Sequence, residues 1–403
     1  MHDSPFTALY AGLQNELLTR QQQGLYRQRR VLESAQGVRV QIAGQSYLNF
    51  CSNDYLSLAS HPSMIEAMQQ AAARYGVGSG AAHLVNGHST PHHRLEEALA
   101  EFTGYPRALL FSTGYMANLG VMSALSGRHD TIYADKLNHA SLIDAAQLSG
   151  ARLQRYAHAD ASALATRLSA HDKGTALIAT DGVFSMDGDL APLPEIAELA
   201  AKHQSWLLVD DAHGLGVMGE AGRGSLQHFG LGRNAVPIYM GTLGKALGSF
   251  GAFVAGEAVL IETLIQQARS YIYTTALPPA VAEATRTSLK LIQTEADRRQ
   301  HLHELIRYFR QSAQQLGLPL MESITPIQPL LIGDNQRALA ISQGLMEQGL
   351  LISAIRPPTV PAGTARLRIT LCADHCKADI DQLLDALQAM DLASTTEPQK
   401  APL

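Results

Sequence analysis

The residue of this sequence best suited to covalent chemistry is Lys245. It follows an apolar run, lies three residues after the hydroxyl of Thr242, and is flanked by small, glycine-rich residues within segment 236–256. Most lysines are solvated surface residues, but burial among small residues lowers the pKa of the amine and frees it to form a Schiff base. A nucleotide-binding loop is the competing hypothesis for the Gly-Lys pair. That loop needs glycine and Ser/Thr where this chain has Tyr239 and Ala246, so we exclude it.

Two carboxylates, Asp210 and Asp211, end a second apolar run. His213 follows two residues after Asp211. Side chains alternate along a strand, so we expect one carboxylate to face a ligand and the other the interior. An aspartate at a buried strand end can keep a ring nitrogen protonated, as an electron-sink cofactor requires. It can equally cap a helix or bind magnesium, and this segment alone does not choose.

The same region contains a glycine pattern, 214–219, that matches the dinucleotide-binding fingerprint and follows a predicted strand. That fingerprint must open a helix and be followed by an acidic residue at the end of a second strand roughly 20 residues on. Neither is present, so we exclude a nicotinamide or flavin site here.

Three further groups are predicted at the ends of strands. Gly114 and Tyr115 open a helix, where backbone amides attract an anion such as phosphate, although a plain strand-to-helix turn explains them equally well. His139 and Ser185 each follow a predicted strand. Phosphate ligands, a flat ring partner, a strand-end aspartate and a lysine on one edge form the set that pyridoxal phosphate requires.

These residues need a scaffold that brings strand ends together. Short apolar runs alternate with helical patterns through the middle of the chain, which predicts a mainly parallel sheet covered on both faces, with ligands at the carboxyl ends of its strands. The predicted strands are 108–112, 131–134, 153–156, 175–180, 206–210, 236–240 and 252–255. The predicted helices are 91–102, 115–125, 140–148, 161–169 and 194–203.

The flanking segments predict smaller units. Ahead of the sheet we expect a helix with apolar residues on one face, a hairpin of 38–42 and 46–50 turning at Ala43-Gly44, a helix 62–75 and an irregular glycine-rich loop 76–90. After it we expect a helix 262–270, a long helix 279–316 interrupted near 295–299, and strands 327–332, 351–355 and 365–371 with two helices. The expected organisation is 1–50, an N-terminal helix and hairpin; 51–288, a large cofactor-binding domain; 289–393, a small α+β domain; and 394–403, a disordered tail.

Composition excludes several classes of function. The net charge is −5 with no long basic run, which argues against nucleic acid as a partner. No stretch approaches the ~18 apolar residues of a membrane span, and the N-terminus lacks secretory features, so we expect a cytoplasmic protein. Three cysteines are too few for a disulfide framework. Cys372, His375 and Cys376 lack the further ligands of a structural metal site, so we expect no metal.

Six motifs, taken in order, resemble the α-oxoamine synthase family. They are Asn53–Leu56, Phe111–Tyr115, Asn138–Ser141, Asp181–Asp189, Val209–Gly214 and Thr242–Lys245. The resemblance covers nearly the whole chain. It implies a pyridoxal-phosphate enzyme of the aspartate-aminotransferase fold, with a large domain, a smaller C-terminal domain and an N-terminal helical arm. Members are obligate homodimers that condense an amino acid with an acyl thioester and release carbon dioxide.

The resemblance also implies roles for individual residues. Lys245 would form the Schiff base, Asp210 would face the pyridine nitrogen and His139 would stack on the ring. Ser185 and His213 would contact the phenolic oxygen. Gly114, Tyr115 and Thr242 would hold the phosphate with Thr274 or Thr275 of the partner subunit. Arg368 would bind the substrate carboxylate, and Asn53, Thr359 and Arg27 would line the substrate side, with Arg29 or Arg30 as alternatives to Arg27.

Segments 80–92 and 354–368 resemble the branch of the family that joins L-alanine to a pimeloyl thioester in biotin biosynthesis. Whether the acyl group is carried by coenzyme A or by an acyl carrier protein stays open. A glycine-using synthase of the same family is the alternative within this class. A non-catalytic, cofactor-binding subunit is the alternative from another class, and the presence of Lys245 and Asp210 argues against it.

Overall fold

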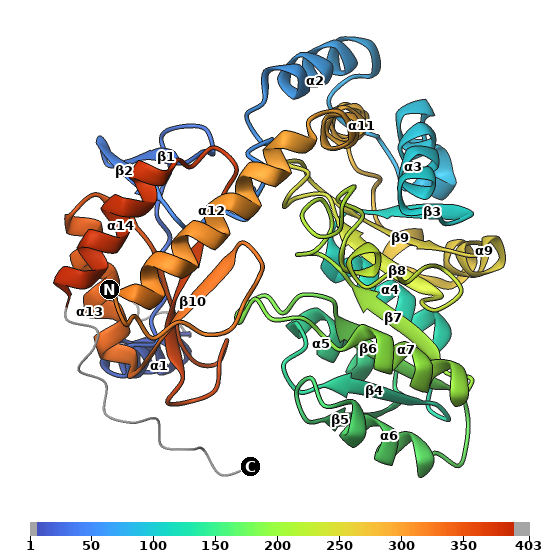
Figure 1. Ribbon diagram of the computed structural model, residues 1–403. Helices are drawn as coiled ribbons and strands as arrows, with labels where there is room; N and C mark the ends of the chain where they lie inside the picture. The colour runs from blue at the N-terminus through green and yellow to red at the C-terminus, as the bar shows by residue number, and fades with distance from the viewer. Residues whose placement is uncertain (1–5, 391–403) are drawn as a thin grey trace.

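The computed structural model describes residues 6–390, so the tail expected at 394–403 lies outside the described residues. Its centre is a seven-stranded sheet with the strand order β3-β9-β8-β7-β6-β4-β5, seen in Figure 1. All strands point the same way except β9, which is antiparallel to both β3 and β8. The bounds are β3 Arg107–Phe111, β4 Thr131–Asp135, β5 Arg152–Tyr156, β6 Ala176–Asp181, β7 Trp206–Asp210, β8 Ile238–Thr242 and β9 Ala252–Gly256.

Helices cover both faces of this sheet, which explains why its strands are largely apolar, except for the edge strand β5 with Arg152, Gln154 and Arg155. Ile132 and Leu177 pack on one face and Tyr133 and Ile178 on the other, all at most 1% exposed. The first face carries α4 Gly114–Leu125, α5 Ala140–Leu148, α9 Ala258–Gln267 and α10 Arg269–Ile272; the second carries α3 Thr90–Thr103, α6 Ala161–Ser169 and α7 Leu193–Lys202. The predicted mainly parallel sheet between helices is confirmed.

Two consecutive helices lead from the central sheet to the C-terminal part of the molecule (Figure 1). The first, α11 Pro279–Thr294, packs against α2 Pro62–Tyr75 and α3, and the second, α12 Ala296–Gln315, packs in the C-terminal part; the break at Glu295 lies where an interruption was expected. A three-stranded antiparallel sheet, in the order β10-β13-β12, follows with α13 Asn335–Glu347 and α14 Lys377–Ala389. Its strands are β10 Ile327–Gly333, β12 Ser353–Ile355 and β13 Ala365–Thr370.

The single strand predicted at 351–355 was wrong. Leu350–Leu351 forms β11, which pairs in parallel with β2, whereas Ser353–Ile355 forms β12, which pairs with β13. Between them Ile352 is fully buried, so the chain passes from one sheet to another without leaving the core. This crossing joins the C-terminal part to the hairpin of β1 Arg39–Ile42 and β2 Gln45–Asn49, whose turn at Ala43 and Gly44 is as predicted.

Other elements also differ from expectation, and the strand predicted at 236–240 lies two residues later, as β8. The helix expected at 262–270 begins at Ala258 and divides into α9 and α10, because Ala268 has an extended backbone. The loop expected at 76–90 contains a π-helical turn, η1 His83–Gly87. The four-residue helix α8 Ser225–His228 was not predicted, whereas α2 Pro62–Tyr75 has the predicted bounds.

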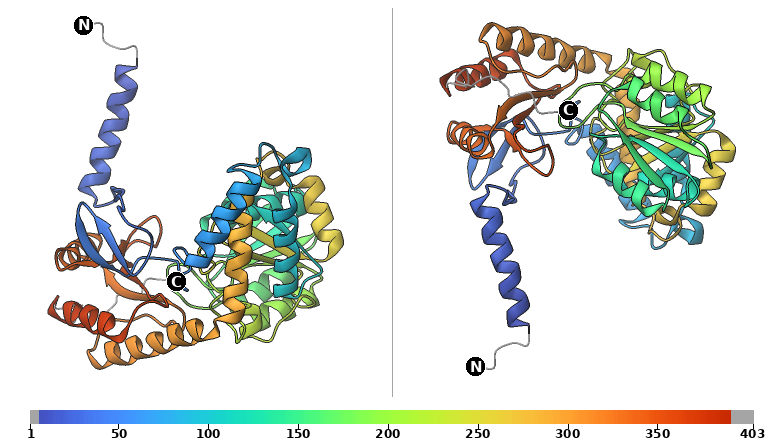
Figure 2. Two further views of the ribbon diagram at one scale, coloured as in Figure 1. Left: turned by 90° about the horizontal axis from the view of Figure 1, so that it is seen from above. Right: turned by 90° about the horizontal axis from the view of Figure 1, so that it is seen from below.

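The N-terminal helix is present as α1 Thr7–Gln22, and none of its residues is buried. Figure 2 shows it extending away from the rest of the molecule. The apolar side chains predicted to share one face are all exposed: Phe6, Leu9, Tyr10, Leu13, Leu17 and Leu18. Within residues 6–390, no helix combines the length and the apolar character needed to cross a membrane.

Candidate active site

The carboxyl ends of β4, β6, β7 and β8 bring the predicted groups to one edge of the sheet. Asp181 of β6 is the register partner of Asp210 of β7, so two buried carboxylates are neighbours there. The backbone N–H of His139, which follows β4, donates to Asp181 Oδ2 at 2.8 Å. Burial and the charge of Asp210 raise the pKa of Asp181 well above its usual range.

Lys245 lies in the connection between β8 and β9, and its Nζ is 2.8 Å from His213 Nε2. Burial lowers the pKa of Lys245 to about 8, although the charges of Asp210 and Asp181 oppose that change. At a pKa of about 8, about a tenth of the amine is uncharged at pH 7, and this is the form that acts as a nucleophile or a base.

A chain of polar contacts leads from Lys245 to the C-terminal sheet. His213 Nδ1 is 2.7 Å from the hydroxyl of Tyr55, which accepts a hydrogen bond of 3.4 Å from Arg368 Nη2. The same guanidinium donates to Asn53 Oδ1 at 3.1 Å and, through Nε, to the carbonyl of Ser185 at 2.7 Å. Burial, followed by the charges of Lys245 and Arg368, lowers the pKa of His213 well below its usual value, so the imidazole is neutral.

Asp210 is held by a second network on the other side of the lysine. Its Oδ2 accepts from Asn118 Nδ2 at 2.8 Å, and its Oδ1 accepts from the backbone of Ala212 at 3.1 Å. Asn118 Nδ2 also donates to Ser141 Oγ, which lies 2.8 Å from His139 Nδ1. Burial lowers the pKa of His139 despite the nearby Asp210 charge, so a neutral ring and a fixed carboxylate share one network.

The turn from β3 into α4 forms a small cradle. Gly114 and Tyr115 are the first residues of α4, and the N–H groups of a first helical turn have no partner inside the helix. A Cβ added to Gly114 would lie 2.8 Å from Thr242 Cγ2, so only glycine lets the two segments approach. The Tyr115 side chain is 42% exposed and its hydroxyl donates to Asp144, leaving the backbone as its contribution to the cradle.

A cavity of about 580 Å³ opens beside these groups and is lined by His139, Ser185 and Thr359 among others. Arg27 Nη2 donates to Thr359 Oγ1 at 3.4 Å, so the N-terminal segment reaches the same side. The structure therefore brings the two residues predicted for the acyl-substrate side together.

Within residues 6–390, Thr274 and Thr275 form no hydrogen bond with the residues of this cluster. Thr275 is exposed and forms a bridge with Ala82, and Thr274 is half-buried. Both follow α10, which packs on α4 through a hydrogen bond of 2.6 Å from Ser270 Oγ to the Met116 carbonyl.

Several histidines gather away from the lysine, near the start of α3. The ligand atoms of His83, His88 and His92 lie within 4.8 Å of one another, which the sequence did not suggest. His92 uses both ring nitrogens, one toward the Leu277 carbonyl at 2.6 Å and one toward the backbone of Ser89 at 3.0 Å. A metal would have to displace those hydrogen bonds. In the cysteine segment, His375 Nδ1 accepts from the Cys372 backbone and Cys376 is exposed.

Three residues of the site were not predicted as site residues, although Tyr55 and Asp181 lie within the family motifs and Asn118 lies three residues after one. Tyr55 connects His213 to Arg368, Asn118 holds Asp210, and Asp181 receives the His139 N–H. Asn118 is on the second turn of α4, and the helical period from Gly114 was the available signal. The glycine pattern 214–219 forms turns rather than a helix, which excludes the dinucleotide hypothesis.

Comparisons with known proteins agree with this geometry. The family model described as aminotransferase class I and II matches residues 45–387. An 8-amino-7-oxononanoate synthase from Thioalkalivibrio sulfidiphilus is 62% identical, covering 93% of this chain and 96% of that relative; one from Pseudomonas savastanoi pv. phaseolicola is 59% identical, covering 96% and 99%. The chain belongs to the 8-amino-7-oxononanoate synthase family.

Solved structures show the fold of this family. Serine palmitoyltransferase from S. paucimobilis, bound to a PLP-myriocin aldimine, matches with a TM-score of 0.90 and 32% identity, covering 97% of this chain and 99% of that one. An 8-amino-7-oxononanoate synthase from Francisella tularensis matches with a TM-score of 0.75 and 34% identity over 85% and 97%. The expected aspartate-aminotransferase-like fold is confirmed.

Proposed function

We propose that the chain catalyses the decarboxylative condensation of L-alanine with a pimeloyl thioester, which yields 8-amino-7-oxononanoate, carbon dioxide and the free thiol carrier. The observation that carries this proposal is the partly buried Lys245, whose amine is desolvated and has a pKa of about 8, on the same sheet edge as Asp210. The curated relatives, about 60% identical over more than nine tenths of the chain, support this synthase rather than its glycine-using sisters.

Pyridoxal phosphate fits the residues present. When bound, it supplies an electron sink that stabilises a carbanion at the α-carbon of an amino acid. Lys245 would hold its carbonyl carbon, and Gly114, Tyr115 and Thr242 its phosphate in the cradle that a Cβ would fill. Asp210, fixed by Asn118, would face the pyridine nitrogen.

The remaining assignments concern the ring and the second subunit. His139 would lie against the ring face, and Ser185 and His213 would contact the phenolic oxygen. A hydroxyl from Thr274 or Thr275 would complete the phosphate site of the partner subunit in a homodimer. These assignments rest on the family resemblance and on the shared sheet edge.

The chain's own groups account for substrate binding and proton transfer. Arg368 is 6% exposed and already oriented by Asn53 and Ser185, so its charge suits the alanine carboxylate in a partly desolvated site. The Lys245 amine, once released, takes the α-proton of alanine. A bond then forms between that α-carbon and the thioester carbonyl carbon as the thiolate leaves. The carboxylate departs as carbon dioxide, and a proton returned by Lys245 completes the amino ketone.

The acyl chain would occupy the cavity lined by His139, Ser185 and Thr359, with Arg27 at its N-terminal side. The carrier is coenzyme A or an acyl carrier protein. We place the enzyme in the cytoplasm, where both carriers and free alanine are available.

The test measures product by mass spectrometry after incubating the purified protein and pyridoxal phosphate with L-alanine or glycine and pimeloyl-coenzyme A or its carrier-protein ester. We expect 8-amino-7-oxononanoate from alanine. Product from glycine alone would contradict the alanine assignment. A protein that forms no product and does not bind pyridoxal phosphate would support the non-catalytic alternative.

A further inference from the structure

The loop 182–191, which carries Ser185, forms hydrogen bonds and an ion pair with the C-terminal part of the molecule. Arg368 Nε donates to the Ser185 carbonyl at 2.7 Å, and Arg366 forms an ion pair with Asp187. The carbonyl of Gly188 accepts hydrogen bonds from Ser323 at 2.9 Å and Thr325 at 3.1 Å. These contacts fix the loop from one side only.

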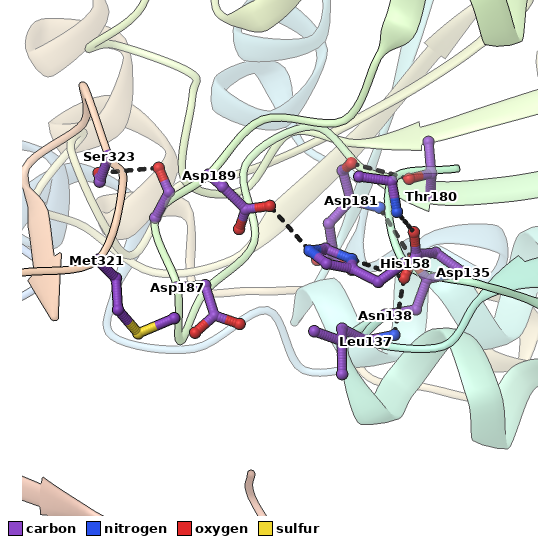
Figure 3. A network of polar contacts seen from close by, with 12 residues as sticks. Asp135, Leu137, Asn138, His158, Thr180, Asp181, Asp187, Asp189, Met321 and Ser323 are labelled. Carbon is purple, nitrogen blue, oxygen red and sulfur yellow. Dashed lines mark hydrogen bonds and ion pairs between the residues drawn. The ribbon is translucent and has the colours of Figure 1, made fainter. Parts of the chain in front are cut away.

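His158, which follows β5, holds the other side of the loop, as Figure 3 shows. Its Nε2 is 2.8 Å from Asp189 Oδ2 and its Nδ1 is 3.0 Å from Asp135 Oδ1. The ring also packs edge-on against Phe184, with centroids 4.4 Å apart and an interplanar angle of 85°. His158 therefore joins the end of β4 to both the start and the end of the loop.

Asp135 is itself rigidly placed. It is 1% exposed, and its two oxygens accept from the backbone of Leu137 at 2.8 Å and of Ala159 at 2.7 Å. These contacts therefore fix the position of the loop relative to the edge of the sheet from which His139 and Asp181 also project.

A metal ion is a competing occupant, since ligand atoms of His158, Asp187 and Asp189 lie within 4.8 Å of one another. Both nitrogens of His158 are already committed to carboxylates, and Asp187 is paired with Arg366. A protonated His158 balances the cluster without a cation. Burial lowers the pKa of His158, but the hydrogen bonds and charges of Asp135 and Asp189 outweigh it and raise the pKa to about 9.

We propose that His158 is a positioning residue, which ties the loop 182–191 to the end of β4 and thereby holds Arg368, through the Ser185 carbonyl, in place for the substrate carboxylate. This inference rests on the proposed function, because it assigns Arg368 to amino-acid binding. His158 touches neither substrate nor cofactor in this scheme. It acts through Asp189 and Phe184 on a loop whose backbone orients the guanidinium.

The experiment uses the full-length protein loaded with pyridoxal phosphate and compares His158→Asn, Asp189→Asn and the double variant. Affinity for L-alanine is measured by titrating the absorbance of the bound cofactor, and kcat and KM are measured for both substrates. His171→Asn is the matched control. That histidine also uses both ring nitrogens, toward Tyr133 and the Gly174 carbonyl, but does not contact the loop.

We expect His158→Asn to retain the cofactor and to bind alanine about ten- to a hundredfold more weakly, because a displacement on the order of 1 Å at a binding group can cost about 100-fold. KM for the pimeloyl thioester should rise as well, because Phe184 and Ser185 of the same loop line the cavity assigned to the acyl chain. Asp189→Asn should reproduce the loss, and the double variant should lose little more than either single one, because all three break the same link. His171→Asn should bind alanine like the unaltered protein.

Two results would overturn the inference alone. One is unaltered alanine affinity in both His158→Asn and Asp189→Asn while the parent protein binds alanine. The other is an equal loss in His171→Asn, which would mean a general loss of stability. A parent protein whose cofactor responds to no amino acid would instead overturn the proposed function.

Discussion

At the scale of single residues, the chemistry depends on how burial shifts the pKa values of neighbouring side chains. Lys245 has a lowered pKa because it is desolvated, and His213 beside it is kept neutral by burial and by the charges of Lys245 and Arg368. Burial raises the pKa of Tyr55, which lies between His213 and Arg368, to about 12, so it stays a neutral hydroxyl over the working range of pH. The site thus combines an amine that loses its proton at a lower pH than an ordinary lysine with hydrogen-bonding partners that do not compete for that proton.

Lys245→Ala should abolish turnover because it removes both the Schiff-base amine and the base. We expect kcat to fall by at least about 10³-fold, while the protein still binds pyridoxal phosphate non-covalently. Product formation and cofactor content after gel filtration measure the two effects. Lys202→Ala on the exposed side of α7 is the control and should be fully active. Substantial product from Lys245→Ala would refute the assigned role.

Asp211 makes a separate prediction about stability and pH. It is fully buried, accepts hydrogen bonds from Ser225 and Tyr239, and burial raises its pKa to about 7. The folded state therefore keeps a proton between about pH 4 and 7 that the unfolded chain releases, so the free energy of unfolding should fall as pH rises through this window.

The side chain introduced by Asp211→Asn does not titrate. The free energy of unfolding of this variant should therefore lack the pH-dependent decrease due to Asp211, which is on the order of 1–3 kcal/mol. Urea unfolding of both proteins at pH 5 and pH 7.5 measures the difference. Asp211→Ala should be the least stable variant, because it leaves the backbone N–H and the hydroxyl of Ser225 buried without their acceptor, whereas Tyr239 keeps the Arg223 carbonyl at 3.2 Å. An identical pH dependence in Asp211→Asn and the parent protein would contradict the raised pKa.

At the scale of elements, the decisive feature is that the ends of parallel strands and the start of α4 meet. The register of β6 and β7 places Asp181 opposite Asp210, and the α4 period places Asn118 above Gly114, one turn farther along the helix. The close approach of Gly114 to Thr242 in β8 sets the width of the proposed phosphate cradle.

Gly114→Ala should widen this cradle, because its Cβ would lie 2.8 Å from Thr242 Cγ2. We expect cofactor affinity to fall about tenfold or more, since misplacement of about 1 Å is costly. Thr242→Ser removes the methyl group and keeps the hydroxyl, so the double variant should regain much of the affinity. Equilibrium titration with pyridoxal phosphate decides this. Failure of the serine to restore any binding would show that the contact is not the cause.

At the scale of the whole molecule, the site is assembled from parts that are distant in the sequence. Arg368 comes from β13 of the C-terminal sheet, Asn53 and Tyr55 from the segment after β2, and Lys245 from the central sheet. The crossing from β11 to β12 links these parts through a buried backbone. α1 carries exposed apolar side chains, and Thr275 is exposed where it bridges Ala82.

Light scattering tests the proposed homodimer and should give about twice the chain mass of 43.3 kDa.

Mixing two inactive variants tests whether the two subunits share their sites. If Thr274 and Thr275 serve the partner's site, Lys245→Ala chains and Thr274→Ala/Thr275→Ala chains should complement each other after joint refolding. One site of each hybrid is then intact, which predicts recovery of roughly a quarter of full activity in a symmetric dimer. No recovery from an equal mixture that does form hybrids would place both hydroxyls outside the partner's site.

The sequence by itself determined the alternating strands and helices, the strand ends that carry Lys245, Asp210 and His139, and the glycine that opens α4. These follow from local apolar runs, helical period and spacing, which act over a few residues. Tertiary structure alone decided that Tyr55 contacts His213, that Asn118 holds Asp210, that His158 joins Asp135 to Asp189, and that 350–355 divides between two sheets. Such pairings depend on which surfaces bury one another across the folded chain, and no local pattern encodes them.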